Sequence, residues 1–107
     1  MKNVYTVKQV NSYIKNMFTQ DFMLNRIYVK GEVSNLKYHT SGHIYFSLKD
    51  ESGTIACVMF AGSRSGLSFH MEEEQQVGVL DSVSVYEREG KYQLYAREII
   101  LDGAGLL

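Results

Sequence analysis

A short polar segment near the middle of the sequence carries the side chains best suited to chemistry. Residues 37–42 read Lys-Tyr-His-Thr-Ser-Gly, so a cation, two rings and two hydroxyls lie close together. His43 and Tyr45 follow at alternate positions. Rings stack on bases and cations neutralise phosphates, which is how proteins hold an unpaired nucleic-acid strand. The segment therefore favours a nucleic-acid-binding surface.

Further cations lie on the strands and loops expected to flank this segment. Lys30 and Lys49 lie on strands on either side of it and are suited to neutralising phosphates. Arg64 lies in a glycine-containing break, and Arg88 lies in the opposite loop. The predicted nucleic-acid-binding residues are Lys30, Lys37, Tyr38, His39, His43, Tyr45, Lys49, Arg64 and Arg88. On spacing alone, ordinary surface residues of a soluble barrel explain this set as well as binding does.

The residue spacing gives no support to metal binding or to catalysis by this chain. His39, His43 and Cys57 lack the paired spacing and fourth ligand of a zinc site. Asp50 and Glu51 are adjacent in a turn, Ser41 and His43 have no orienting carboxylate, and no phosphate-binding loop with lysine occurs. We expect no metal, no cofactor and no catalytic residue here, and we expect Cys57 to be a small buried side chain.

Size and charge limit the possible functions. The chain has 107 residues, enough for one domain with a single core. Its net charge of −1 argues against coating nucleic acid by bulk electrostatics. Between residues 30 and 49, three lysines and one glutamate sum to +2, which leaves −3 for the rest. A local basic strip on an acidic body favours weak, salt-sensitive binding.

The cellular location is predicted from hydropathy and cysteine content. No apolar run approaches the roughly 18 to 20 residues of a membrane span. The first ten residues lack the apolar region of a secretory signal. A lone cysteine cannot form an internal disulfide, so the sequence favours the reducing cytoplasm.

Hydrophobic periodicity predicts one helix and five strands. Thr6 and Gln9 form a capping-box pattern, and apolar residues recur at helical spacing over 7–18, which predicts an amphipathic helix that packs on the sheet. Alternating apolar residues predict strands at about 26–36, 43–50, 54–61, 76–86 and 91–101. Apolar parity changes within the third strand, which predicts a bulge or strong twist there. Residues 62–68 have room for no more than a short helical turn, and Glu72–Glu74 reads as a solvated acidic run.

These elements predict an all-β fold with one N-terminal helix, a five-stranded OB-fold Greek-key barrel. The OB-fold binds oligonucleotides on the face of its second and third strands, between two flanking loops. Gly31 suits the sharp bend of a closing strand. An SH3-like barrel is the structural alternative; the leading helix and long first strand favour the OB arrangement. Tyr86 and Tyr92 are expected to stabilise the last hairpin as a cross-strand pair.

Six blocks of sequence resemble a known family. They are YTV at 5–7, VKGEVSN at 29–35, SGHIYFSLKD at 41–50, VMF at 58–60, VSVYE at 83–87 and GKYQLY at 90–95. In order and spacing they resemble the start of the exodeoxyribonuclease VII large subunits, and they cover nearly all of the chain. The block at 41–50 is the specific one.

The resemblance implies an OB-fold domain, residues 1–107 with its barrel at about 26–102, that binds single-stranded DNA. In this family a catalytic region follows, and then coiled-coil segments that recruit the small subunit. The holoenzyme is a bacterial cytoplasmic hydrolase, an exonuclease that degrades single-stranded DNA from both ends without a strict metal requirement. The family's catalytic motifs lie beyond residue 107, so the resemblance implies a piece of a longer protein that is not itself catalytic.

The sequence also departs from the family pattern. Asp81-Ser82 and Glu72–Gln75 stand where family members carry glycine, and the stretch after Phe60 is less basic than is usual. Both departures weaken the electrostatic contribution to binding. Two alternatives remain open: a protein-interaction domain that docks on its own catalytic region or on a neighbouring subunit, and an RNA-binding OB module.

Overall fold

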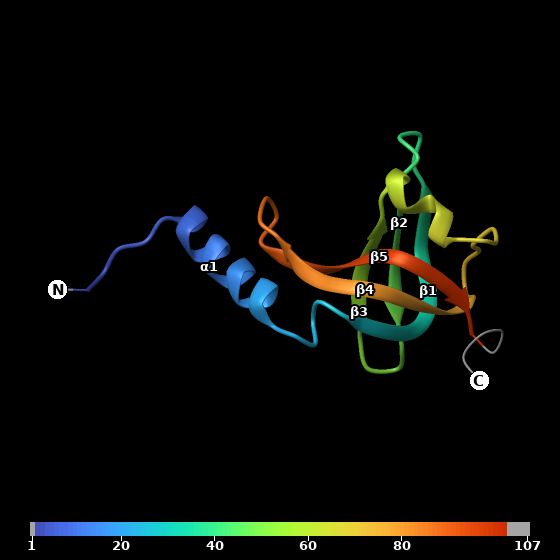
Figure 1. Ribbon diagram of the computed structural model, residues 1–107, viewed down its shortest axis with the longest axis horizontal. Helices are drawn as coiled ribbons and strands as arrows, with labels where there is room; N and C mark the ends of the chain where they lie inside the picture. Colours follow the sequence, from blue (N-terminus) through green and yellow to red (C-terminus); the bar gives the residue numbers. More distant parts are fainter. Residues whose placement is uncertain (1, 103–107) are drawn as a thin grey trace.

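The five strands close into a single barrel. The computed structural model describes residues 2–102, and its strands follow the order β1-β2-β3-β5-β4 around the barrel (Figure 1). The strands are β1 (Ile27–Tyr38), β2 (Ile44–Lys49), β3 (Thr54–Met59), β4 (Gln76–Tyr86) and β5 (Lys91–Leu101). Helix α1 (Val7–Gln20) precedes them, and a short 3₁₀ helix, η1 (Ala61–Gly66), lies between β3 and β4. The predicted OB-type barrel with one N-terminal helix is confirmed.

The long strand β1 pairs with two neighbours. Its first half pairs with β4 and its second half with β2, and Gly31 lies where the two halves meet. A Cβ on Gly31 would lie 3.2 Å from both the Leu48 Cβ and the Lys49 carbonyl oxygen. The close approach of β1 and β2 at this point explains the glycine predicted for a bending strand. Beyond it, β1 bulges between Ser34 and Lys37.

Strands β3 and β5 close the barrel as a parallel pair. Cys57 and Val58 pair with Leu94 and Tyr95, and an isolated bridge joins Leu67 to Ile99. The inward side chains of all five strands, with Met71 from the segment before β4, form one core cluster: Val33, Ile44, Phe46, Leu48, Cys57, Met59, Met71, Val77, Val79, Val83, Leu94, Ala96 and Ile99. The prediction that Cys57 is buried is confirmed, at 2% exposure.

Of the two features predicted for the third strand, a bulge or a strong twist, the bulge is wrong. Strands β2 and β3 pair in unbroken register from Ile44–Met59 to Lys49–Thr54. The apparent change of parity arises because Cys57, Val58 and Met59 are all buried. Val58 lies outside the core cluster, on the outer face of β3, where neighbouring side chains cover it. Burial of both faces mimics a bulge in the sequence pattern.

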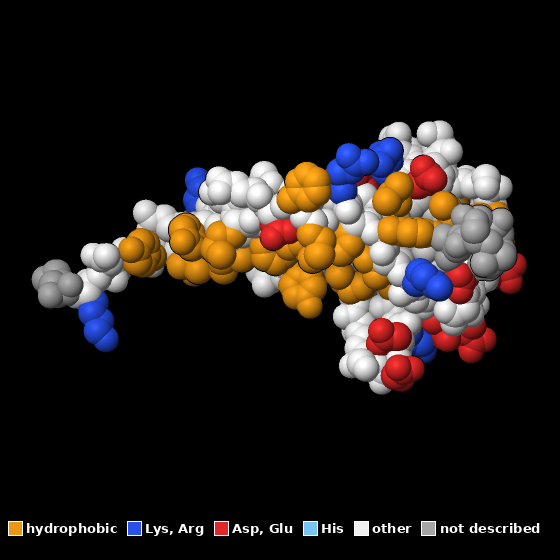
Figure 2. Space-filling view, turned by 60° about the horizontal axis from the view of Figure 1, so that its bottom comes forward, with side chains coloured by type: hydrophobic (Ala, Val, Ile, Leu, Met, Phe, Trp, Pro, Cys, Tyr) orange, Lys and Arg blue, Asp and Glu red, His pale blue; other side chains and the backbone are white. Residues whose placement is uncertain are grey.

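Helix α1 forms as predicted but packs differently. The Thr6 side chain accepts a hydrogen bond from the Gln9 backbone, and the Gln9 side chain accepts one from the Thr6 backbone, which completes the capping box. No residue of α1 is fully buried, and Phe18 alone in the helix packs against the core cluster. The prediction that the apolar stripe docks on the sheet is therefore confirmed for Phe18 and wrong for the rest of the stripe, which is exposed. Figure 2 shows apolar side chains along the exposed length of the helix.

Polar contacts, together with the Phe18 ring at 6.3 Å from that of Tyr92, hold α1 to the β4–β5 hairpin. The side chain of Asn11 donates to the Glu87 carbonyl oxygen at 3.1 Å, and Ser12 donates to the Glu87 carboxylate at 2.8 Å. Lys15 pairs with the same carboxylate at 3.4 Å. A closed barrel buries its apolar side chains internally, so little apolar sheet surface remains for the helix to cover.

Candidate nucleic-acid interface

The loop between β1 and β2 is held in shape by its own hydrogen bonds. The Nδ1 atom of His39 accepts from the Ser41 backbone N–H at 3.0 Å and lies 2.8 Å from the Ser41 hydroxyl oxygen. That hydroxyl accepts from the His43 backbone N–H at 3.2 Å. Gly42 has a φ of +94°, a left-handed conformation that favours glycine at the tip. The loop is therefore ordered before any ligand arrives.

Tyr38 and Arg64 support this loop from behind. The Tyr38 ring stacks on His70 at a centroid distance of 4.7 Å, and its hydroxyl accepts from the Met71 backbone N–H at 2.8 Å. The Arg64 guanidinium lies 5.5 Å from the Tyr38 ring centroid and donates to the Gly42 carbonyl oxygen at 3.0 Å. These contacts tie η1 and the segment before β4 to the loop.

His43 is held between two aromatic neighbours. Its Nδ1 accepts a hydrogen bond from the Ala61 backbone N–H at 2.9 Å, so this nitrogen carries no proton and Nε2 does. Its ring meets Tyr45 edge to face at 6.3 Å and Phe60 at 5.2 Å. Tyr45 also meets His39 edge to face at 6.0 Å. Despite these contacts, Tyr45 is 41% exposed and Phe60 is 46% exposed.

These rings belong to a larger cluster on the outside of the barrel. Tyr45 on β2 pairs with Val58 on β3, which in turn pairs with Tyr95 on β5. Phe60, just after β3, lies 5.8 Å from Tyr95. We call this cluster the aromatic wall; it comprises His39, His43, Tyr45, Phe60 and Tyr95. Lys37 on β1 pairs with Tyr45 and borders the wall.

Two members of the aromatic wall, Phe60 and Tyr95, were not among the predicted binding residues. The pairing of Ile44 with Met59 places Phe60 on the outer face, opposite His43. The change of apolar parity within the third strand gave no sign of this position in the sequence. Tyr95 carries no signal either, because its proximity depends on the non-local pairing of β3 with β5.

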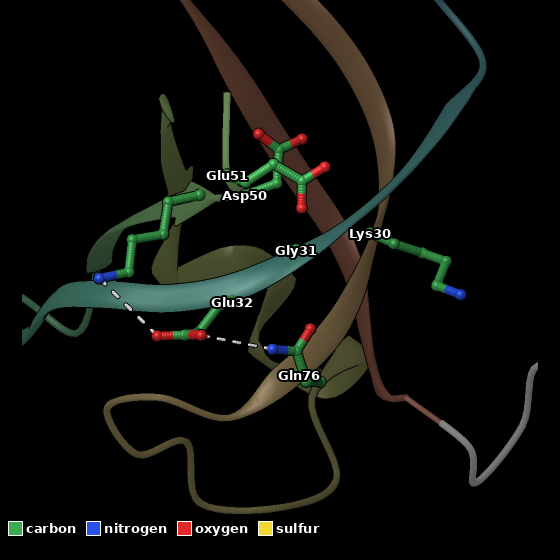
Figure 3. A pocket seen from close by; sticks show the side chains of 7 residues that line it. Lys30, Gly31, Glu32, Asp50, Glu51 and Gln76 are labelled. Atoms are coloured by element: carbon green, nitrogen blue, oxygen red, sulfur yellow. Dashed lines mark hydrogen bonds and ion pairs between the residues drawn. The ribbon is translucent and has the colours of Figure 1, made fainter. Parts of the chain in front are cut away.

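Lys30 and Lys49 lie at the other end of their strands. Lys30 pairs with Asp102 at 3.6 Å, and Lys49 pairs with Glu32 at 3.7 Å. The hollow beside them has a volume of about 550 Å³. Glu32, which lines it, also accepts a hydrogen bond from the Gln76 side chain (Figure 3). Its remaining lining residues are Gly31, Asp50 and Glu51. The carboxylates here offset both lysines.

Arg88 is also apart from the aromatic wall. It is exposed in the β4–β5 hairpin, next to the residue that holds α1. Among residues 2–102, Lys37, Arg64 and Arg88 have no carboxylate within ion-pair distance, in contrast to Lys30 and Lys49. The structure thus brings six of the predicted residues together: Lys37, Tyr38, His39, His43, Tyr45 and Arg64.

Within the described part of the chain, no three His, Cys, Asp or Glu side chains are placed to hold a metal ion. The helices of residues 2–102 are also too short or too polar to span a bilayer. The remaining chemistry of the wall is stacking, hydrogen bonding and charge neutralisation.

A closed five-stranded barrel with exposed rings beside its first loop defines a class of nucleic-acid-binding domains. Residues 5–100 match the family described as "OB-fold nucleic acid binding domain", and the chain belongs to this family. Asparaginyl-tRNA synthetase from Pyrococcus horikoshii has a similar fold, with a TM-score of 0.55 over 74% of this chain and 20% of the synthetase chain, at 17% identity.

The relatives in sequence are exodeoxyribonuclease 7 large subunits, which confirms the resemblance drawn from the six blocks. The protein of Lachnoclostridium phytofermentans is 72% identical over 107 residues, which is all of this chain and 27% of the relative. The protein of Clostridium botulinum strain Okra is 54% identical over 100 residues, 94% of this chain and 25% of the relative. The chain therefore spans about a quarter of the length of these relatives.

Proposed function

We propose that this chain binds single-stranded DNA at the aromatic wall and presents it to a nuclease region outside the chain. The whole protein would then act as the large subunit of a cytoplasmic exodeoxyribonuclease VII. It would degrade unpaired DNA from both ends and recruit a small subunit through regions beyond this domain. The observation that carries the proposal is the contiguous aromatic wall beside Lys37 on the outside of an OB-fold barrel, in which His39, Tyr45 and Phe60 are exposed.

The wall suits sequence-tolerant binding. Stacking on an aromatic side chain contributes about 1 to 3 kcal/mol per base, and every base has a face that can stack. Edge-to-face contacts already hold Tyr45 between His39 and His43, so little side-chain freedom is lost on binding. The Nε2–H of His43 supplies a hydrogen-bond donor for a base or sugar.

Phosphates would be neutralised by the predicted cations to different extents. Lys37 and Arg64 lie next to the wall, and Arg88 is exposed on the hairpin. Lys30 and Lys49 must exchange carboxylate partners to contribute, although exposed ion pairs of this kind are worth only about 0 to 1 kcal/mol. Tyr38 acts by positioning the loop. With a net charge of −1, binding by this chain is expected to be modest and sensitive to salt.

The test is fluorescence anisotropy with labelled oligo-dT over a range of salt concentrations. Tyr45→Leu is expected to weaken binding by about tenfold, because one stacking face is lost. Lys37→Gln is expected to lower the slope of log K against log salt by about 0.7, the value for one phosphate contact on a single strand.

The matched controls are Tyr13→Leu and Lys8→Gln on α1, which remove the same residue types far from the wall in sequence and leave binding unchanged. Competition by an unlabelled ribo-oligonucleotide of equal length shows whether the chain prefers DNA or RNA. Equal affinity for duplex and single-stranded DNA, or no binding at low salt, would contradict the proposal.

A further inference from the structure

We infer that Arg64 serves the proposed site chiefly as a positioning residue that fixes the β1–β2 loop, and not chiefly as a phosphate contact. Its guanidinium joins the tip of the loop to the Tyr38 ring, and so sets how the loop stands on the barrel. This inference rests on the proposed function, because it assigns the shape of that site to a side chain that the sequence suggested only for its charge.

The β1–β2 loop is closed by hydrogen bonds within itself. The His39 backbone N–H donates to the His43 carbonyl oxygen at 3.0 Å, and the Gly42 backbone N–H donates to the His39 carbonyl oxygen at 2.9 Å. These bonds shape the loop but do not join it to the body of the barrel. The strand that leads into it is irregular, because the register of β1 with β2 shifts between Ser34 and Lys37. The orientation of the loop therefore depends on contacts from outside it.

Helix η1 provides such contacts. It lies beside the β1–β2 loop at one end of the barrel (Figure 1). The Ala61 backbone N–H donates to Nδ1 of His43 at 2.9 Å, and Nη1 of Arg64 donates to the Gly42 carbonyl oxygen at 3.0 Å. Gly42 comes so close to this helix that an added Cβ would lie 3.1 Å from the Ala61 Cβ. The loop is thus supported from η1.

The Arg64 side chain is itself held by an aromatic stack. Its guanidinium carbon lies 5.5 Å from the centroid of the Tyr38 ring, within the range of a cation–π contact. Tyr38 packs against the core cluster, and its ring stacks on His70 with 8° between the planes. Its hydroxyl accepts from the backbone N–H of Met71, which is buried. A chain of contacts therefore leads from the core through Tyr38 and Arg64 to the Gly42 carbonyl.

The backbone that carries Arg64 is anchored as well. Gly66 allows η1 to approach the β5 backbone at Arg97, and Leu67 forms a bridge with Ile99 on β5. Arg64 lies just before this anchor. A side chain on a fixed backbone loses less freedom when it bonds the loop, so its contacts stabilise one loop orientation more effectively.

Lysine could not replace arginine in this role. The guanidinium lies over the Tyr38 ring while one of its nitrogens donates to the Gly42 carbonyl oxygen. A lysine ammonium is a compact, strongly hydrated charge on a flexible stem, and it lacks the planar fork that makes both contacts together. Arg64→Lys therefore keeps a positive charge beside the proposed site but releases the loop.

The first experiment measures amide hydrogen exchange of the free chain by NMR. We expect Arg64→Lys to exchange faster at Gly42, His43 and Ala61, whose amide hydrogens are bonded within the loop or between the loop and η1. Arg26→Lys is the matched control, because Arg26 is exposed in the segment between α1 and β1. A phosphate contact alone predicts no change without DNA, so unchanged exchange in Arg64→Lys would overturn the inference.

The second experiment measures oligo-dT binding by anisotropy over a range of salt concentrations. Arg64→Lys is expected to bind about tenfold more weakly, with the same slope of log K against log salt, because the charge is kept. Tyr38→Leu removes the ring beside the guanidinium. The double variant is expected to bind no more weakly than the weaker single variant, since both changes release the same loop.

Circular dichroism melting of each variant checks that the barrel is intact. Arg64→Lys is expected to melt as the unmodified chain does, because the side chain it changes is exposed. Additive losses of affinity in the double variant, or an Arg64→Lys variant that binds as tightly as the unmodified chain, would contradict the positioning role.

The outcomes separate this inference from the proposed function. If the unmodified chain binds and Tyr45→Leu weakens binding, but Arg64→Lys changes neither exchange nor affinity, the positioning role is wrong and the proposed function stands. If the unmodified chain does not bind single-stranded DNA, both fail.

Discussion

At the scale of single residues, Val58 links the binding surface to stability. Its side chain points away from the core cluster but is only 1% exposed, between Tyr45 and Tyr95. The rings therefore shield an apolar side chain from water as well as offering faces for stacking. For this reason the tests above use leucine, which keeps part of that cover, and not alanine.

Cys57 provides a prediction about reactivity. Burial raises the pKa of its thiol to about 12, from an ordinary value of 9.0. The thiolate is the reactive form, so Cys57 is expected to react with iodoacetamide only when the barrel opens. Mass spectrometry of the native chain at pH 8 should show slow alkylation, and the same chain in urea should show fast alkylation. Rapid alkylation of the folded chain would contradict the buried position.

The same shift predicts how stability depends on pH. Because the pKa is raised in the folded state, the unfolded thiol ionises first. The contribution of Cys57 is complete below about pH 9 and falls as pH rises toward 12, by up to about 1.4 kcal/mol per pH unit. Urea unfolding at pH 7 and pH 10 measures this loss of stability. Cys57→Ala is the control, because it removes the contribution of the thiol and leaves the lysines and tyrosines, which also titrate at high pH, in place.

At the scale of elements, α1 is attached by polar contacts centred on Glu87 and by Phe18, whose ring lies 6.3 Å from that of Tyr92. The hydrogen bond from Ser12 is the main reason that the pKa of the Glu87 carboxyl is lowered, with Lys15 adding to it. We expect Glu87→Gln to increase amide hydrogen exchange in α1 and to leave the exchange of the barrel strands unchanged.

Lowering the pH should have the same effect as this substitution. A lowered folded-state pKa means that the attachment is complete above the ordinary glutamate pKa of 4.5 and is lost as pH falls through the lowered value. Glu89→Gln is the control, because Glu89 pairs with Lys91 within the hairpin. Unchanged exchange in α1 for Glu87→Gln would contradict this account.

The sequence predicted the existence of these elements better than their packing. The capping box and the helical period predicted α1 at 7–18, against Val7–Gln20 in the structure. Alternation likewise predicted β4 and β5 with their observed bounds. The docking of α1 could not be predicted, because an apolar stripe indicates that a helix seeks a partner surface but not whether the barrel offers one.

At the scale of the whole molecule, the packing of η1 against β5 depends on Gly66. A Cβ on this residue would lie 1.9 Å from the Arg97 carbonyl oxygen and 2.9 Å from its carbon, both backbone atoms. We expect Gly66→Ala to lower the free energy of unfolding by about 3 kcal/mol, since η1 must move away from β5. Urea denaturation measures the change.

Gly62→Ala is the matched control for this prediction. Gly62 lies in the same short helix, and an added Cβ would meet nothing within 4 Å. We expect its effect to stay within about 0.5 kcal/mol. Similar losses of stability in both variants would show that η1 tolerates a side chain at neither position. That result would contradict the specific role of Gly66 in the close approach to β5.

Part of the proposed binding surface could be predicted from the sequence because strand alternation, which also predicted the fold, is a local pattern. Tyr45 and His43 could be assigned to an outer face because alternation in β2 is local. Lys30 and Lys49 also face outward, but their distance along the strands from the loop and their carboxylate partners depend on the three-dimensional arrangement. Tyr95 reaches Phe60 only through a pairing between distant parts of the chain.

The circular strand order has a consequence for assembly. Each strand of the barrel already has two hydrogen-bonded neighbours, so a foreign peptide finds no free edge to which it can add as a sixth strand. The domain is thereby protected from edge-to-edge aggregation. Other macromolecules therefore cannot bind by adding a strand and must bind through side chains. Helix α1 lies outside the closed barrel, so it can change its neighbours without breaking a hydrogen bond between strands.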